Sequence, residues 1–139
     1  MKYLRSALFT LGLLLAVSAT QAQRVRVKAD IPFDFAVGNQ VLPAGEYQVI
    51  PTGGSLQTLL IRASESTDTA AVITFACSDA KRTDTTKLVF HVVGGRYFLS
   101  QIWTEGYEQG RQLPKSKMET QLAKNSTTEE LFLAANVTR

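Results

Sequence analysis

The sequence predicts an all-β domain: a single antiparallel barrel or sandwich of about seven or eight strands, with one short helix near the C-terminus. Two observations lead to this prediction. Apolar and polar residues alternate with a period of two along short segments, which is typical of strands because successive side chains point to opposite faces of a sheet. Clusters of glycine, proline and asparagine interrupt these segments about every ten residues, as in sandwiches and barrels.

Residues 1–22 have the three parts of a secretory signal peptide. A basic start precedes an apolar run over 7–17, and Thr20 and Ala22 occupy the −3 and −1 positions of a cleavage site. The apolar run is far shorter than the ~20 residues that span a bilayer. We therefore expect export to the periplasm or the medium, and a mature chain, 23–139, that forms one β-rich domain without a transmembrane segment.

Charge and cysteine content exclude several classes of protein. The full chain has 15 basic and 12 acidic residues, a formal charge of +3, and removal of the leader lowers this to +1. A nearly neutral chain argues against nucleic-acid binding, which needs clustered basic residues. The single cysteine excludes a disulfide scaffold and a cysteine-rich metal site. We predict neither a metal nor another cofactor.

The first half of the mature chain is predicted to contain five strands. Turns are expected at 38–39, at 42–45, where proline and glycine occupy favoured turn positions, and at 52–55. A mostly polar segment, 77–86, is the longest expected loop. The predicted strands cover residues 24–29, 31–37, 46–50, 56–62 and 69–76.

The clearest local prediction is a tight hairpin whose turn is formed by two glycines, 94–95. Favoured two-residue turns need positive φ, which glycine adopts freely. A loop of two residues would place Val93 opposite Arg96 and Phe90 opposite Leu99. The face expected in the core contains Leu88, Phe90, Val92, Tyr97, Leu99 and Trp103. The other face is mixed, and we expect it partly in solvent or under a loop; it contains Lys87, Val89, His91, Val93, Arg96, Phe98, Ser100 and Ile102.

A short helix is expected after Pro114. Ser116 and Glu119 match a capping box, in which the serine hydroxyl and the glutamate carboxylate bind free backbone N–H groups at the helix start. Two turns, ending near Asn125, are expected. The tail over 129–137 is ambiguous, because its apolar spacing fits both a strand and a helix.

Several segments together resemble a group of small exported proteins of acidobacterial-type genomes, which share an IPFxFxVGxxxLPAGxYxV opening. The matching segments are IPFDFAVG over 31–38, LPAGEYQV over 42–49, LVFH over 88–91, YFLSQIW over 97–103, and the stretch 114–124. The resemblance implies export, a single β-rich domain and a strand rather than a helix at the end of the chain. That group has no assigned activity, so it supplies no catalytic residues.

Few residues suggest catalysis. His91 is the only histidine and Cys77 the only cysteine, and a Cys–His pair would require the strands over 69–76 and 88–93 to be neighbours. No third group to orient the histidine is evident. We therefore expect a small residue at a strand end and a histidine on a mixed sheet face, and no enzyme active site.

Three residues are predicted to bind a ligand: Trp103, Tyr107 and His91. Ligand sites favour aromatic side chains with few polar groups, although aromatics in alternating strands more often belong to the core. The partner is unknown. The function we predict is that of an exported, non-enzymatic binding or structural module of the envelope or the extracellular space. The alternative is a β-barrel that carries a small apolar ligand, since eight strands can enclose one.

Overall fold

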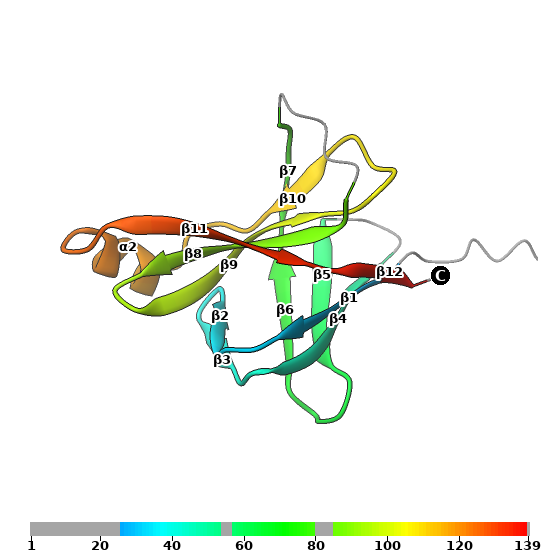
Figure 1. The fold of residues 1–139 in the computed structure, drawn as a ribbon, viewed down its shortest axis with the longest axis horizontal. Helices are drawn as coiled ribbons and strands as arrows, with labels where there is room; N and C mark the ends of the chain where they lie inside the picture. Colours follow the sequence, from blue (N-terminus) through cyan, green and yellow to red (C-terminus); the bar gives the residue numbers. More distant parts are fainter. Residues whose placement is uncertain (1–25, 54–56, 80–84, 139) are drawn as a thin grey trace, which may run out of the picture.

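The computed structural model describes residues 26–53, 57–79 and 85–138, and the expected leader lies outside them. Over these residues the chain forms twelve strands and one helix, arranged as two sheets that do not close into a barrel (Figure 1). The predicted all-β class is confirmed in its sandwich form. The predicted number of strands is too small, because corner residues divide two of the expected strands and because the short strands Gln40–Leu42 and Gly110–Gln112 were not predicted. No helix among the described residues is long and apolar enough to span a bilayer.

The first sheet has five strands, and every neighbouring pair is antiparallel. Its order is β12 (Asn136–Thr138), β1 (Arg26–Ile31), β4 (Gly45–Pro51), β5 (Thr58–Ala63) and β6 (Thr69–Ile73).

The second sheet has seven strands. The main path runs through β11 (Thr128–Ala134), β8 (Lys87–Val93), β9 (Arg96–Trp103), β10 (Gly110–Gln112) and β7 (Phe75–Cys77). A small hairpin made of β2 (Phe35–Val37) and β3 (Gln40–Leu42) joins it through a short parallel pairing of β2 with β9.

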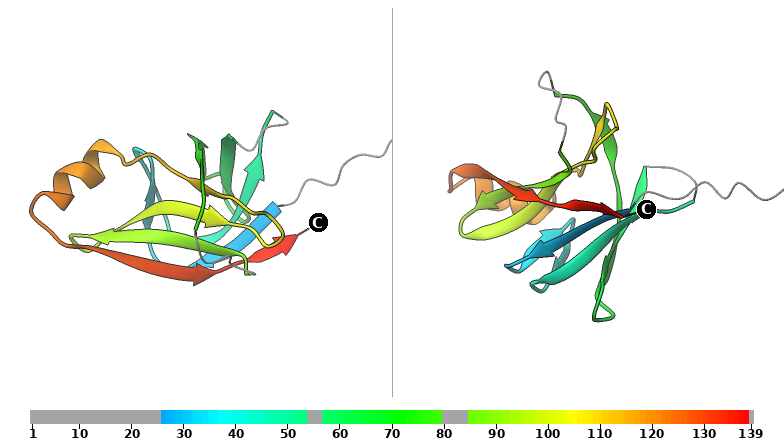
Figure 2. Two further views of the ribbon diagram at one scale, coloured as in Figure 1. Left: turned by 90° about the horizontal axis from the view of Figure 1, so that it is seen from above. Right: turned by 45° about the vertical axis from the view of Figure 1, so that its right-hand side comes forward.

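The chain passes directly from one sheet to the other at two corners. Only Thr74 separates β6 from β7, and only Ala135 separates β11 from β12. The right-hand view of Figure 2 shows the two sheets diverging from the corner where β11 leads into β12. Strands that change sheet at a bend are typical of sheets packed at a large angle. Continuous chain therefore links the two sheets, although their hydrogen-bonded ladders stay separate.

The core lies between the two sheets and is rich in aromatic residues. Phe35 packs edge-on against Tyr47 and Phe90, with ring centroids 5.0 and 5.8 Å apart. The buried core residues are Val27, Ala29, Ile31, Phe35, Val37, Leu42, Tyr47, Val49, Leu59, Ile61, Ala63, Ala70, Leu88, Phe90, Leu99, Ile102 and Leu113.

The expected strand over 31–37 is interrupted. β1 ends at Ile31, since Pro32 has no N–H for the ladder. The Asp34 carboxylate then accepts a hydrogen bond from the Ala44 N–H at 2.9 Å, and the chain resumes as β2 at Phe35. Between β1 and β2, the Asp34 side chain therefore forms a hydrogen bond with the loop backbone where a ladder bond between strands was expected.

The β8–β9 hairpin pairs as predicted near its turn. Both turn glycines have positive φ, and the predicted register holds as far as the pair formed by Phe90 and Leu99. A β-bulge between Val89 and Phe90 then shifts the pairing by one residue, so that Val89 faces Gln101 instead of Ser100. Residues of β9 beyond the bulge therefore exchange faces, whereas those of β8 keep the predicted ones.

The bulge places Trp103 on the opposite sheet face from the one predicted, although its side chain is buried as expected. Leu88 faces Ile102 across the strands, and both belong to the core between the sheets. Trp103 pairs with Lys87 and is buried outside that core, with its ring against Gly110. A Cβ at Gly110 would lie 2.7 Å from ring atom Cδ2 of Trp103, so glycine is required there for packing.

The predicted helix is confirmed as α2 (Lys117–Ala123), which begins after Ser116. The Ser116 hydroxyl accepts a hydrogen bond from the Glu119 N–H at 3.2 Å. The second half of the expected capping box is not formed, because the Glu119 carboxylate contacts His91 instead.

The helix covers the face of the second sheet that points away from the main core, and Figure 2 (left) shows it at one end of the molecule. A second apolar cluster there comprises Ala36, Val93, Phe98, Met118, Leu122 and Ala123. The mixed face of the hairpin is thus covered by a helix instead of a loop. The ambiguous tail is a strand, since β11 pairs with β8 along its whole length.

Candidate functional site

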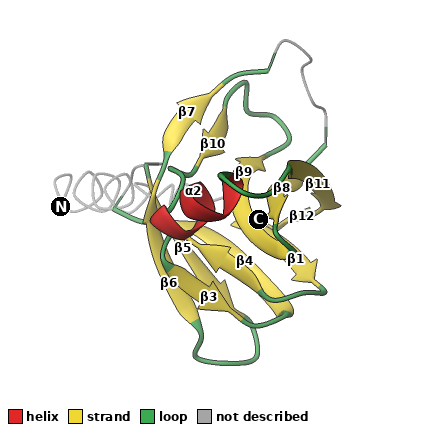
Figure 3. Cartoon of the chain, turned by 90° about the vertical axis from the view of Figure 1, so that its left-hand side faces the viewer, coloured by secondary structure: helices red, strands yellow, loops and turns green. Residues whose placement is uncertain are grey.

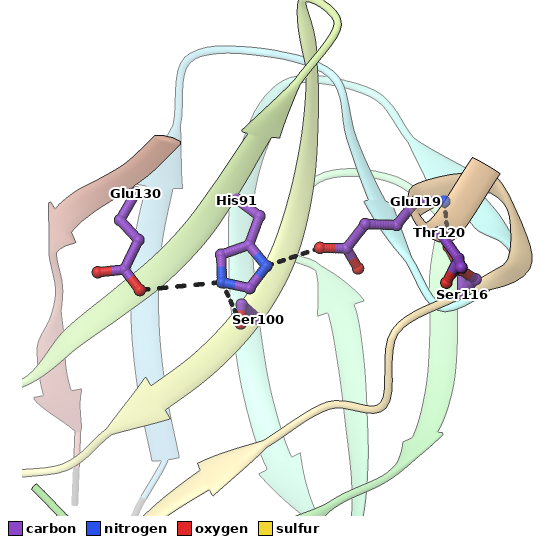
Figure 4. Close-up of polar contacts among 6 residues, drawn as sticks. All are labelled: His91, Ser100, Ser116, Glu119, Thr120 and Glu130. Atoms are coloured by element: carbon purple, nitrogen blue, oxygen red, sulfur yellow. Dashed lines mark hydrogen bonds and ion pairs between the residues drawn. The ribbon is translucent and has the colours of Figure 1, made fainter. Parts of the chain in front are cut away.

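His91 lies in a polar cluster at the junction of four elements (Figure 4). Its Nδ1 is 2.6 Å from Oε1 of Glu119 on α2, and its Nε2 is 3.1 Å from Oγ of Ser100 on β9. Oε1 of Glu130, on β11, is 3.9 Å from the same Nε2. These elements meet because β8 lies between β9 and β11 while α2 packs across them.

The cluster is mostly buried. The side chains of His91 and Glu119 are 15% and 7% exposed, and Ser100 is 5% exposed. With neutral His91, a proton on Nδ1 lets the ring donate to Glu119 while Nε2 accepts from the Ser100 hydroxyl, so every buried group has a partner. Glu130 is 57% exposed and lies at the rim of the cluster.

The order serine, histidine, carboxylate is also that of a nucleophilic triad. A nucleophile must reach its substrate, however, and Ser100 is almost fully buried in the middle of a strand. Ser100 lines neither of the two depressions described below. The cluster is therefore best explained as a set of buried hydrogen bonds that hold α2 against the second sheet.

Cys77 and His91 are not brought together as a dyad. β7 pairs with β10, whereas β8 pairs with β9 and β11. Burial raises the pKa of the Cys77 thiol, which the Arg111 charge only partly offsets, so the reactive thiolate is disfavoured.

A groove of about 430 Å³ opens beside α2, between the β2–β3 hairpin and the start of β9. It exists because β2 pairs with β9 over only two residues, beyond which the two hairpins separate. Its size falls within the range of small-molecule sites, about 300–1,000 Å³. The lining residues are Asp34, Phe35, Ala36, Val41, Gly95, Arg96, Tyr97, Phe98 and Met118.

The groove is lined by several apolar side chains and by Arg96, which carries a guanidinium group. Nη1 of Arg96 donates to Sδ of Met118 at 3.1 Å, and sulfur is a weak acceptor. Among the described residues Arg96 forms no ion pair with an acid. The Asp34 carboxylate already accepts from the Ala44 N–H. Arg96 therefore retains most of its capacity to bind an anion.

A second, much smaller pocket of about 40 Å³ opens between the two sheets. This volume holds a few water molecules at most and is far below that of a typical ligand site. Its lining residues are Val27, Val49, Pro51, Leu59, Ile102, Thr104, Tyr107, Gln109 and Arg111.

The three predicted ligand-binding residues do not share one site. Tyr107 lines the small pocket, and His91 belongs to the polar cluster. Trp103 donates from Nε1 to Oε1 of Gln101 at 3.0 Å and lies five residues along β9 from Phe98, which pairs with His91. At strand spacing, this separates Trp103 from His91 by about 16 Å.

The sequence reasoning missed the groove and the role of Glu119. The groove depends on a parallel pairing between segments some sixty residues apart, for which local patterns give no signal. The contact between Glu119 and His91 was not predicted, because the capping-box match assigned the Glu119 carboxylate to the backbone at the helix start. Among the described residues no three His, Cys, Asp or Glu side chains are grouped so that they could hold a metal ion.

Comparison of the chain with protein-family models, curated proteins and solved structures finds no match.

Proposed function

We propose that this chain is an exported, non-enzymatic binding module whose ligand site is the groove between the β2–β3 hairpin and β9. Export is inferred from the leader-like sequence over 1–22. The observation that carries the binding proposal is a groove of about 430 Å³ with apolar walls and a guanidinium that has no acidic partner among the described residues. Its ligand is a small molecule with an apolar body and one acidic group.

The floor of the groove is formed before any ligand arrives. Phe35, Ala36 and Phe98 are buried and held by the β2–β9 pairing, so little conformational entropy is lost there on binding. Val41 is 57% exposed on the wall. Covering it would contribute about 1 kcal/mol, as expected for the exposed part of a valine side chain. A carboxylate or phosphate on Arg96 would add a charge-assisted hydrogen bond.

The second candidate is a carrier that holds an apolar ligand between the sheets. The apolar lining of the small pocket and the half-exposed Tyr107 at its mouth favour this function. Its volume of about 40 Å³ opposes it, because the sheets would have to separate to admit a ligand. The groove needs no such rearrangement, so we prefer it.

Titration with octanoate and with octanol tests the proposal, monitored by chemical-shift changes of backbone amides. We expect octanoate to perturb residues 95–98 and to bind at least fivefold more weakly to Arg96→Gln, which should bind octanol unchanged. Val41→Asp should weaken the binding of both molecules. Native mass spectrometry of the protein as purified would show any ligand that it already carries.

Tyr107→Ser is the matched control, because it alters an exposed lining residue of the other pocket. It should leave octanoate binding intact. If Tyr107→Ser lost octanoate binding while Val41→Asp retained it, the ligand site would lie between the sheets and not in the groove. Absence of any shift near the groove, at millimolar octanoate, would end the groove proposal.

A further inference from the structure

The segment 69–77 forms one continuous outer edge of the sandwich. β6 is the end strand of the first sheet and β7 the end strand of the second, and only Thr74 separates them. Figure 3 shows the two strands following one another along one side of the molecule. An edge strand presents backbone N–H and C=O groups that a further strand can pair with.

The backbone of Ala71 and Ile73 points toward this open edge. The Thr74 N–H donates to the Gln57 carbonyl, in register with the pairing of β5 and β6. Hydrogen-bonding direction alternates along an antiparallel strand, so Thr69, Ala71 and Ile73 face away from β5. The Thr69 carbonyl, which accepts from Nε2 of Gln40 on β3, confirms this direction. Because Gln40 covers Thr69, the free positions on β6 are 71 and 73.

The side chains at this edge are apolar and exposed. Ile73 is 64% exposed and Phe75 is 60% exposed, and Ala71 is exposed beside them. Ala71 pairs with Leu60, which pairs with Ile50, so an apolar row continues from the edge across the outer face of the first sheet. Contiguous exposed apolar surface of this kind marks protein interaction sites.

This edge lacks the charges that protect other edge strands from association. No residue of 69–77 is charged. At the opposite edge of the second sheet, β11 carries Glu129 and Glu130, both exposed. Charged side chains on edge strands oppose pairing with a further strand, and their absence leaves the 69–77 edge open to it.

We propose that the 69–77 edge is the contact surface for a second copy of this chain. The two copies of β6 pair antiparallel about a two-fold axis at Val72, which places Ala71 opposite Ile73 of the partner subunit. Each such pair exchanges both backbone hydrogen bonds, as antiparallel ladders require. The two five-stranded sheets thereby become one continuous sheet of two copies.

A second copy suits this edge for three reasons. With the axis at Val72, the backbone groups of Ala71 and Ile73 both form hydrogen bonds with the partner subunit. Thr69, whose carbonyl is covered by Gln40, is not needed for this pairing. A small side chain, Ala71, meets a large one, Ile73, on the same face. Self-pairing of a strand often places like charges close together, whereas this strand has none to repel one another.

The contact is small. Stable interfaces bury about 1,200–2,000 Å² in total, and one short strand pair with its flanking side chains buries less. We therefore expect a weak dimer that dissociates on dilution through the micromolar range. This inference is independent of the ligand groove, because Arg96, Val41 and Met118 lie outside the 69–77 edge.

Sedimentation velocity of the purified protein from 5 to 500 μM tests the dimer. We expect the weight-average mass to rise from one copy toward two. Ile73→Lys should raise the dissociation constant at least tenfold, and its fold should be intact because the side chain is exposed. Phe132→Lys is the matched control, since Phe132 is 58% exposed on the opposite edge strand and should leave dimerisation unchanged.

Cysteine cross-linking tests the register. In a Cys77→Ser background, Val72→Cys should form an intermolecular disulfide under mild oxidation much faster than Ile73→Cys, because only position 72 faces itself. The proposal is overturned if the protein stays monomeric at 500 μM, if it grows beyond two copies, or if Ile73→Lys dimerises as strongly as the unchanged chain. Equal cross-linking at both positions would overturn the register.

Discussion

Removing His91 is the change that most directly tests the polar cluster beneath α2. In His91→Phe the ring volume is largely kept, but the Glu119 carboxylate loses its 2.6 Å partner while only 7% exposed. The Ser100 hydroxyl loses its partner, Nε2 of His91, as well. Leaving a buried acceptor without its hydrogen-bond partner costs about 1–3 kcal/mol, and more when the group is charged. We expect the free energy of unfolding to fall by about 3 kcal/mol.

A double-mutant cycle separates this cause from lost packing. Glu119→Leu removes the carboxylate, and the combination with His91→Phe leaves neither an unpaired charge nor an unpaired ring nitrogen. The double variant should therefore be more stable than His91→Phe alone, since apolar replacement of a whole buried pair is often neutral or stabilising. Glu130→Gln, at the exposed rim, should change stability by no more than about 0.5 kcal/mol.

Urea denaturation measures the stability of the unchanged chain and of the four variants. With a denaturant dependence of about 1–3 kcal/mol per molar urea, a loss of 3 kcal/mol lowers the midpoint by at least about 1 M. The reasoning would be refuted if His91→Phe cost less than 0.5 kcal/mol, or if the two single changes added without interaction. A catalytic role for the cluster predicts a different result: activity of the unchanged protein that Ser100→Ala removes without loss of stability.

Three further predictions follow from packing and ionisation. Gly110→Ala should destabilise the fold by about 1–3 kcal/mol and shift tryptophan emission, because its Cβ would meet the Trp103 ring; unchanged emission and stability would contradict this. Tyr47→Phe should cost about 1 kcal/mol in urea denaturation, since the hydroxyl donates to the Pro43 carbonyl at 2.6 Å. Burial raises the pKa of the Cys77 thiol, so alkylation at pH 8 should be slower than that of a free thiol and accelerate at higher pH; faster alkylation would exclude this environment.

The raised pKa of Tyr47 also has a consequence for stability. Burial, with smaller effects from the Asp68 and Asp34 charges, favours the neutral phenol in the folded chain. The stability that this provides is fully present below the ordinary pKa of tyrosine and is lost as pH rises through the folded value. Alkaline unfolding should therefore accompany the phenolate absorbance change, and Tyr47→Phe should unfold at higher pH than the unchanged chain.

Much of the fold could be predicted from local patterns. Alternation located most of the strands, the glycine pair defined the β8–β9 turn, and Ser116 marked the start of the helix. Each of these features depends on groups within a few residues, and neighbouring residues in the chain are always neighbours in space. The ends of strands were less predictable, as the interruption of the expected strand at Pro32 shows.

The candidate site was much less predictable. Of the three proposed ligand-binding residues, Tyr107 lines the small pocket between the sheets, and neither His91 nor Trp103 lines that pocket or the groove. Arg96 and Val41 were not predicted to bind a small ligand, although both line the groove. One extra residue at the β-bulge places Trp103 on the face opposite the main core, and the alternating pattern of the sequence does not predict this bulge.

The amino-acid order alone was sufficient to determine the β class, the hairpin turn and the helix start, because these follow from short-range sterics and hydrogen bonding. Only the assembled fold decided that Glu119 reaches His91, that β2 lies beside β9 and that 69–77 forms an open edge. Alternation specifies which face of a strand is apolar but not which strand will cover it. Which strand covers an apolar face depends on packing between segments far apart in the chain, because the summed free energies of many contacts decide between the possible arrangements.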